Sequence, residues 1–179
     1  MRRARAAFHP RIPGWNGAGP WSYGRRMTTR AHLSTAGEGV ELSSPDAKVT
    51  VKAGAEHTGG AYELFEIDAP RGPAVPLHRT PWAKAYYVLF GRMAVLVDGE
   101  RYELGPGSSI TVPPGAPHTF TVHGPSVQFL AFSLTGAMGR FFRDVDQAVP
   151  EGTPLGEAVA RLGPVAERHG ITMVGGPQP

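Results

Sequence analysis

The chain has 179 residues, 41% of them hydrophobic, which suits one globular domain with extensions. It has no cysteine, which excludes disulfides and thiolate metal sites, and no apolar run near the roughly 20 residues that span a bilayer. The formal charge is +3, but residues 1–30 hold seven arginines and no acid, which leaves 11 basic against 15 acidic residues in the rest. A nucleic-acid surface on the folded part is therefore not expected.

Residues 1–30 are arginine-rich and interrupted by prolines and glycines, which predicts a disordered basic extension. Arg2-Arg3 is similar to the start of a twin-arginine signal, but no apolar segment follows it. A polybasic arm for nucleic acid or anionic lipid and a translation start at Met27 are the other interpretations. We expect residues 1–26 to be dispensable for folding and the protein to be cytoplasmic.

Short strands are predicted next, over residues 40–56 and 61–67. Branched residues flank the turn formers of residues 43–46 in the first stretch, and aromatic and branched residues fill the second. Three prolines and a glycine in residues 68–76 then break the pattern. Together with the 24 glycines and 18 prolines of the whole chain, this favours a fold of many turns and short strands.

The stretch that begins at Lys84 alternates with a period of two, which predicts a further strand. Lys84, Tyr86 and Val88 share one face of this strand, while Tyr87 lies on the other. We expect Gly91 to end the strand.

A hairpin follows, because Asp98-Gly99 between two alternating segments is a strong type I′ turn signal. Residues 113–115, Pro-Pro-Gly, predict another tight turn. After it, His118 and Phe120 share one face of a strand. Residues 128–132 form the last clear strand.

In the C-terminal part of the chain, the apolar residues are spaced as in a helix. Apolar residues between Thr135, a plausible N-cap, and Pro150 predict an amphipathic helix. Residues 155–162 suggest a second helix, and residues 164–169 a third short turn. The predicted organisation is a disordered extension (1–30), a β-barrel (31–134), and a helical extension with a loose tail (135–179).

Two motifs within residues 72–122 resemble those of the cupin superfamily. Gly72 is followed after five residues by His78, and a second series runs from Gly107 through Pro113 and Gly115 to His118. The passages FSLTGAMGRFF and VAERHGITMVGGP look like the tail of single-domain cupins related to quercetin dioxygenases. The resemblance implies an all-β fold, a cupin jelly-roll β-barrel with short C-terminal α-helices.

The metal-binding cupins carry three histidines and a glutamate as ligands. The resemblance places His78 and His118 at the first and last of these positions, whereas Thr80 and Lys84 stand at the other two. No acidic residue lies between residues 68 and 98, so a shifted alignment restores no carboxylate. His78 and His118 are thus the candidate metal ligands, and the Lys84 ammonium would repel a dication by several kcal/mol at roughly 5 Å.

The resemblance implies three classes of function. The first is a metal-dependent dioxygenase of the quercetin type, with Fe, Ni or Mn as cofactor. The second is a metal-free isomerase or cyclase, with His78, His118 or Lys84 as catalytic groups. The third is a non-catalytic pocket for a small organic anion. We favour a protein that binds a small anionic or aromatic molecule, with an eroded metal site and catalysis left open.

The ligand pocket is expected to pair Lys84 with an anion, because a buried unpaired charge is costly, unless the ammonium reaches the barrel mouth. Trp82 is expected at that mouth, as a cap on the ligand or as part of a dimer contact. A homodimer through an exposed sheet edge is expected, as is the absence of any membrane partner. The expected pocket residues beside the candidate catalytic groups are Thr80, Trp82, Tyr86, Val88 and Phe120.

Overall fold

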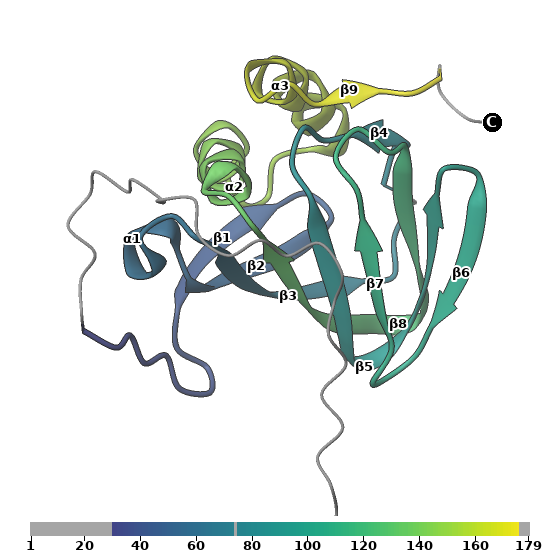
Figure 1. The fold of residues 1–179 in the computed structure, drawn as a ribbon. Helices are drawn as coiled ribbons and strands as arrows, with labels where there is room; N and C mark the ends of the chain where they lie inside the picture. Colours follow the sequence, from purple (N-terminus) through teal and green to yellow (C-terminus); the bar gives the residue numbers. More distant parts are fainter. Residues whose placement is uncertain (1–29, 74, 176–179) are drawn as a thin grey trace, which may run out of the picture.

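A computed structural model describes residues 30–73 and 75–175, and its strands close into a β-barrel with helices outside it (Figure 1). The predicted all-β jelly-roll fold with C-terminal helices is confirmed. The helices are α1 (Ala55–Thr58), α2 (Ala137–Ala148) and α3 (Leu155–Arg168). The strands are β1 (Val40–Ser44), β2 (Ala47–Ala53), β3 (Glu63–Pro70), β4 (His78–Arg79), β5 (Lys84–Val97), β6 (Glu100–Leu104), β7 (Ser109–Val112), β8 (His118–Ser133) and β9 (Thr172–Met173).

Strand β8 is the organising element of the barrel, because it pairs on both edges. One edge pairs antiparallel with β5, from Val97 opposite His118 to Lys84 opposite Ser133. The other edge pairs with β3 at its C-terminal half and with β4 at its N-terminal end, where His78 lies opposite His118. The two halves of the sequence motif are thereby joined at one end of β8.

The hairpin at Asp98-Gly99 has the predicted geometry. It connects β5 to β6, and Val97 pairs with Glu100 on either side of the two-residue turn. Asp98 has a φ of 51° and Gly99 a φ of 87°, and a type I′ turn requires positive values at both positions.

Gly91 does not end a strand, so this part of the prediction is wrong. Strand β5 continues through it, and the register with β8 shifts between Gly91 and Arg92. Its φ is +77°, and a Cβ atom here would lie 2.3 Å from the carbonyl oxygen of Ser126. Glycine therefore allows the strand to bend tightly against β8 without being interrupted.

The core lies inside the barrel and follows the predicted alternation. In the first part of β5, Lys84, Tyr86 and Val88 are buried, whereas Tyr87 and Leu89 are exposed. Buried apolar residues of β2, β3 and β8 complete the interior. The period of two thus places one charged residue, Lys84, on the inward face of a central strand.

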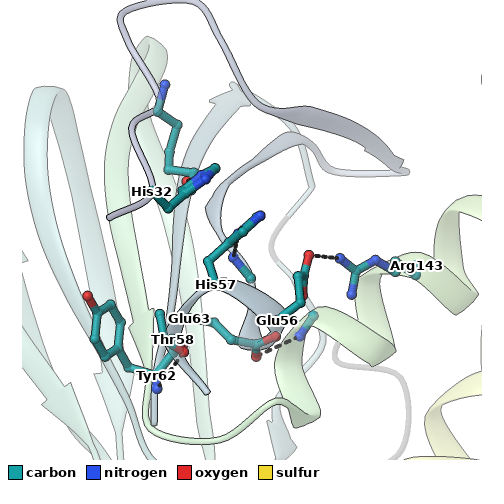
Figure 2. A network of polar contacts seen from close by, with 10 residues as sticks. His32, Glu56, His57, Thr58, Tyr62, Glu63 and Arg143 are labelled. Atoms are coloured by element: carbon teal, nitrogen blue, oxygen red, sulfur yellow. Dashed lines mark hydrogen bonds and ion pairs between the residues drawn. The ribbon is translucent and has the colours of Figure 1, made fainter. Parts of the chain in front are cut away.

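Helix α2 packs its apolar face on the barrel and is held by polar contacts at its N-terminal half (Figure 2). The ring of Phe142 meets Phe65 of β3 edge-on, with centroids 5.7 Å apart. The buried carboxylate of Glu63 accepts a hydrogen bond from the Gly139 N–H at 3.0 Å. Arg143 forms an ion pair of 3.1 Å with Glu56 of α1. These contacts fix α2 against one side of the barrel.

The C-terminal region differs from the prediction in two ways. Residues 155–168 form one helix that continues through Pro164, rather than a helix and a separate turn. After it, β9 returns to the barrel and pairs with β4, Met173 lying opposite His78. A two-residue strand is too short to show a period, so only tertiary pairing defines it.

The predictions for residues 1–29 and 176–179 fall outside the described residues. None of the described helices is long and apolar enough to cross a membrane.

Candidate functional site

His78 and His118 lie side by side because their strands pair in register. The two residues are direct partners in the β4–β8 ladder, and their ring centroids are 4.3 Å apart with planes inclined by 57°. His118 is almost completely buried, whereas His78 is partly buried. The sequence spacing of the two motifs therefore produces a histidine pair at one end of the barrel interior.

Each histidine is oriented by a backbone carbonyl two residues before it. Nδ1 of His78 lies 2.8 Å from the Pro76 oxygen, and Nδ1 of His118 lies 2.8 Å from the Ala116 oxygen. Because a carbonyl oxygen only accepts hydrogen bonds, each Nδ1 carries the proton and each Nε2 keeps its lone pair. Nε2 of His118 is buried and has no partner among residues 30–73 and 75–175.

Lys84 is held in the middle of the sheet, since its backbone pairs with Val112 of β7 on one side and Ser133 of β8 on the other. Only 8% of the residue is exposed, and Nζ lies 5.9 Å from the centroid of the Tyr86 ring. No acidic residue in the described part of the chain forms an ion pair with it. Burial lowers the pKa of Lys84 to about 7.

The two histidines and Tyr86 are neutral near pH 7. Burial, followed by the charge of Lys84, lowers the pKa of His78 to about 4 and the pKa of His118 to about 3. Burial raises the pKa of Tyr86 well above its usual range, so its phenol stays protonated. The site therefore combines two imidazole lone pairs, one phenol donor and one amine that titrates near neutrality.

A cavity of about 110 Å³ lies next to these groups. Helix α2 contributes Met138, Phe141 and Phe142 to its wall, so the helix covers this end of the barrel interior. Asp46, from the exposed turn between β1 and β2, is at the rim. The volume is well below the roughly 300–1,000 Å³ typical of pockets for drug-sized ligands.

The cavity brings together most of the residues that the sequence analysis named. Val88 is not in the wall, because it is fully buried in the core opposite Phe129. His118, whose ring is next to that of His78, is not among the residues that line the cavity. The named residues that line the cavity are His78, Thr80, Trp82, Lys84, Tyr86 and Phe120.

Trp82 is not at an open mouth, which corrects the expectation from the sequence. It is 5% exposed, and its ring lies 6.1 Å from that of Phe141 on α2. The helix covers the position that sequence reasoning left open to solvent. The indole N–H is buried and has no acceptor within the described ranges.

Sequence reasoning missed the contribution of α2 and of the turn before β2. The apolar face of α2 was visible as a helical repeat, but the repeat does not say which surface it covers. Ile171, just before β9, lines the cavity as well. Nothing in the sequence pattern singled out Asp46, which the fold brings to the rim.

The donor set does not suit a resident transition metal. Within residues 30–73 and 75–175, no group of three or more histidine, cysteine or acidic side chains is placed to hold one. The two Nε2 atoms are suitable ligands, but the Thr80 hydroxyl donates to the Trp82 carbonyl at 3.1 Å. Lys84 stands where a third strong ligand would be needed, and a protonated amine repels a metal cation.

Comparison with known proteins agrees with the fold and the paired motifs. Residues 64–133 match the family described as "Cupin domain". The barrel and the histidine pair on neighbouring strands agree with this match. Within residues 64–133, the chain carries an incomplete form of the metal-binding motif of cupins.

Among characterised relatives, quercetin 2,3-dioxygenase from Bacillus subtilis is 27% identical over 112 residues, which are 62% of this chain and 33% of that protein. The chain thus matches only about a third of the length of this relative. Two solved structures share the fold. KdgF from Halomonas sp. has a TM-score of 0.52 and 18% identity over 59% of this chain and 94% of its own. An RmlC-like cupin from Shewanella frigidimarina has a TM-score of 0.51 and 20% identity over 59% and 93%.

Proposed function

We propose that the barrel cavity binds a small organic anion, and that Lys84 supplies the positive charge that a metal ion supplies in metal-binding cupins. The observation that carries this proposal is the Lys84 side chain itself, which borders the cavity and has no acidic partner among the described residues. A buried ammonium without a partner is unfavourable, and a bound carboxylate or phenolate relieves this cost.

An unsatisfied donor of the site supports an anionic ligand. The indole N–H of Trp82 is buried without an acceptor in the described part of the chain, and both Trp82 and Lys84 line the cavity. Hydrogen bonds to ionised groups are roughly twice as strong as neutral ones. Because the pKa of Lys84 is about 7, a bound anion should favour its protonated form. Binding is therefore expected to take up a proton at about pH 8.

The side chains that line the cavity indicate the chemical character of the ligand beyond its anionic group. Aromatic rings of Tyr86, Phe120 and Phe141 suit a short apolar or aromatic body, and the volume of about 110 Å³ excludes a large one. Where the pocket is catalytic, we propose a metal-free isomerase or cyclase reaction. In it the His78 Nε2 lone pair accepts a proton or hydrogen bond, and the Tyr86 phenol donates one.

The alternative is a metal-dependent dioxygenase of the quercetin type, which the similarity to the Bacillus subtilis enzyme favours. In that case His78 and His118 would hold Fe, Ni or Mn through their Nε2 atoms, and Lys84 would have to remain neutral beside the ion. We rank this alternative second, because Thr80 and Lys84 stand at positions where metal-binding cupins have metal ligands.

A homodimer stays a prediction. It is supported by exposed apolar side chains on β5 and β6, Tyr87, Leu89, Phe90 and Tyr102. Sedimentation at two protein concentrations tests it. The cytoplasmic location also stays a prediction.

Calorimetric titration with matched pairs of small molecules tests the anion site. Lactate and benzoate are compared with lactamide and benzamide, in the presence of a chelator. We expect the carboxylates to bind at least tenfold more tightly than the amides, and Lys84→Met to remove this preference. Lys48→Met is the matched control, because Lys48 pairs with Glu41 on the surface. Equal binding of amides and carboxylates, or binding abolished by the chelator, contradicts the proposal.

A further inference from the structure

We propose that the side-chain amine of Lys84 forms a covalent imine with a small 2-oxo acid held in the barrel cavity. This inference rests on the proposed anion site and adds a reaction to it. It assigns Lys84 the role of a nucleophile, and it narrows the ligand to an anion that also carries a carbonyl group.

The geometry places the side-chain amine of Lys84 at the cavity and those of the two other lysines outside it. Lys84 starts a strand that is paired on both edges, so its Cα is fixed, and the residue borders the cavity. The chain contains only two other lysines, Lys48 and Lys52. Lys48 forms an ion pair with Glu41 at 2.6 Å, and Lys52 donates to the backbone oxygens of Thr35 and Glu38. Neither of them borders the cavity.

The state of the amine is favourable for attack on a carbonyl carbon. Only a neutral amine is nucleophilic, and an exposed lysine with a pKa near 10.4 is neutral in roughly one molecule in a thousand at about pH 7.5. Lys84 is 8% exposed and has no acidic partner in the described part of the chain, and this burial lowers its pKa and so favours the neutral amine. The charged and titratable groups that face it are His78 from β4, His118 from β8 and Tyr86 from β5, with Asp46 at the rim.

The reaction needs no oxidant or reductant. The nitrogen lone pair of Lys84 forms a bond to the carbonyl carbon, and the carbonyl π electrons move to oxygen, which takes up a proton. A second proton converts this hydroxyl into water as the carbon–oxygen bond breaks, and the nitrogen, which has lost one of its own protons, becomes an iminium. In total, a primary amine, a ketone or aldehyde and one proton give an iminium ion and one water molecule.

The site's charges favour an oxo acid over a simple aldehyde. An iminium at Lys84 is a buried cation, and no carboxylate within the described ranges pairs with that position. The carboxylate of a 2-oxo acid is bonded directly to the iminium carbon and so brings its own counter-charge. The protonated phenol of Tyr86 is a donor for the oxygen that develops charge, and the small cavity suits an acid of few carbon atoms.

Reductive trapping on the full chain tests the inference. The protein is incubated with pyruvate and sodium cyanoborohydride at about pH 7.5, digested, and the modified peptides are quantified by mass spectrometry. We expect the adduct at Lys84 to form at least tenfold faster than at Lys48 or Lys52, which serve as internal controls in the same digest. Because the comparison is made within the wild-type protein, it does not depend on a variant that folds.

The same samples separate this inference from the proposed anion site. Lactate has the carboxylate but no carbonyl, so it should bind the site and slow trapping at Lys84 without forming an adduct. Lys84→Arg should keep lactate binding and lose the fast-forming pocket adduct. If lactate binds but neither pyruvate nor glyoxylate is trapped at Lys84, the imine proposal is wrong and the proposed anion site is supported. If the three lysines are modified equally and lactate does not bind, both proposals are wrong.

Discussion

At the scale of single residues, Lys84 determines the character of the site. A carboxylate at this position would attract a metal ion toward the two imidazoles, whereas the ammonium repels it. The ammonium also adds to burial, the larger cause, in lowering the pKa of both histidines. One residue thus changes the expected ligand from a cation to an anion. The histidine pair, its carbonyl contacts and its free Nε2 atoms are otherwise those of a metal-ligand pair.

The buried amine should make stability depend on pH above neutrality. The pKa of Lys84 falls from 10.5 to about 7 on folding, so between these values the unfolded chain binds more protons than the folded one. Under this condition the free energy of unfolding rises with pH. We expect a rise of up to about 5 kcal/mol between pH 7 and 10.5, measured by urea denaturation.

Lys84→Met is the matched variant, because methionine keeps the apolar stem without the amine. Its stability should be flat from pH 7 to about 9 and higher than that of the wild type at pH 7. At higher pH the raised pKa of Tyr86 lowers the stability of both proteins alike, because the unfolded chain then loses a proton that the folded one keeps. The lowered pKa values of His78 and His118 change the free energy of unfolding only below about pH 6.5, so they do not affect the comparison of the two proteins above pH 7. A wild-type profile parallel to that of Lys84→Met would mean that the amine is not buried in solution.

At the scale of elements, pairing and packing decide what the sequence pattern leaves open. The Asp98-Gly99 hairpin and the inward face of β5 were predictable, because turn chemistry and a period of two act locally. The course of β5 through Gly91 was not, since a glycine marks a bend as well as an end. Whether the strand bends or ends at Gly91 depends on the close approach of Ser126 from β8.

Substitution of Gly91 by alanine tests that close contact. The change adds the strain of a positive φ and a Cβ that would lie 2.3 Å from the Ser126 oxygen. We expect a loss of about 3 kcal/mol or more in the free energy of unfolding, because backbone must shift. Gly107→Ala is the control, with a φ of +84° and open space around the added atom, and should cost about 1 kcal/mol. Equal losses in the two variants would rule out the contact as the cause.

The candidate site was only partly predictable at this scale. The motif spacing gave His78 and His118, and alternation added Lys84 and Tyr86. The cover of the cavity was not predictable, because α2 and the segment before β9 reach it through packing that lies far away in sequence. Trp82 is buried for the same reason.

At the scale of the whole molecule, the strands form a barrel with the C-terminal helices outside it (Figure 1), and α2 lines one side of the cavity. Strand β8 brings both motif halves together at its N-terminal end, and α2 is tied to β3 beside the other end of β8 through Glu63 and Phe65. The result is a small covered cavity instead of an open mouth. Cavity size and charge together define the expected ligand, a small organic anion.

The most direct test of the central claim is a calorimetric titration of Fe, Ni and Mn into three proteins. They are the wild type, Lys84→Glu, and Lys84→Glu combined with Thr80→His. Metal affinity should rise in that order, since the changes remove the repelling cation and add first one ligand and then another. Together they tighten binding by up to several kcal/mol. Stoichiometric binding of any of these ions by the wild type at submicromolar concentration would contradict the account and put the dioxygenase alternative first.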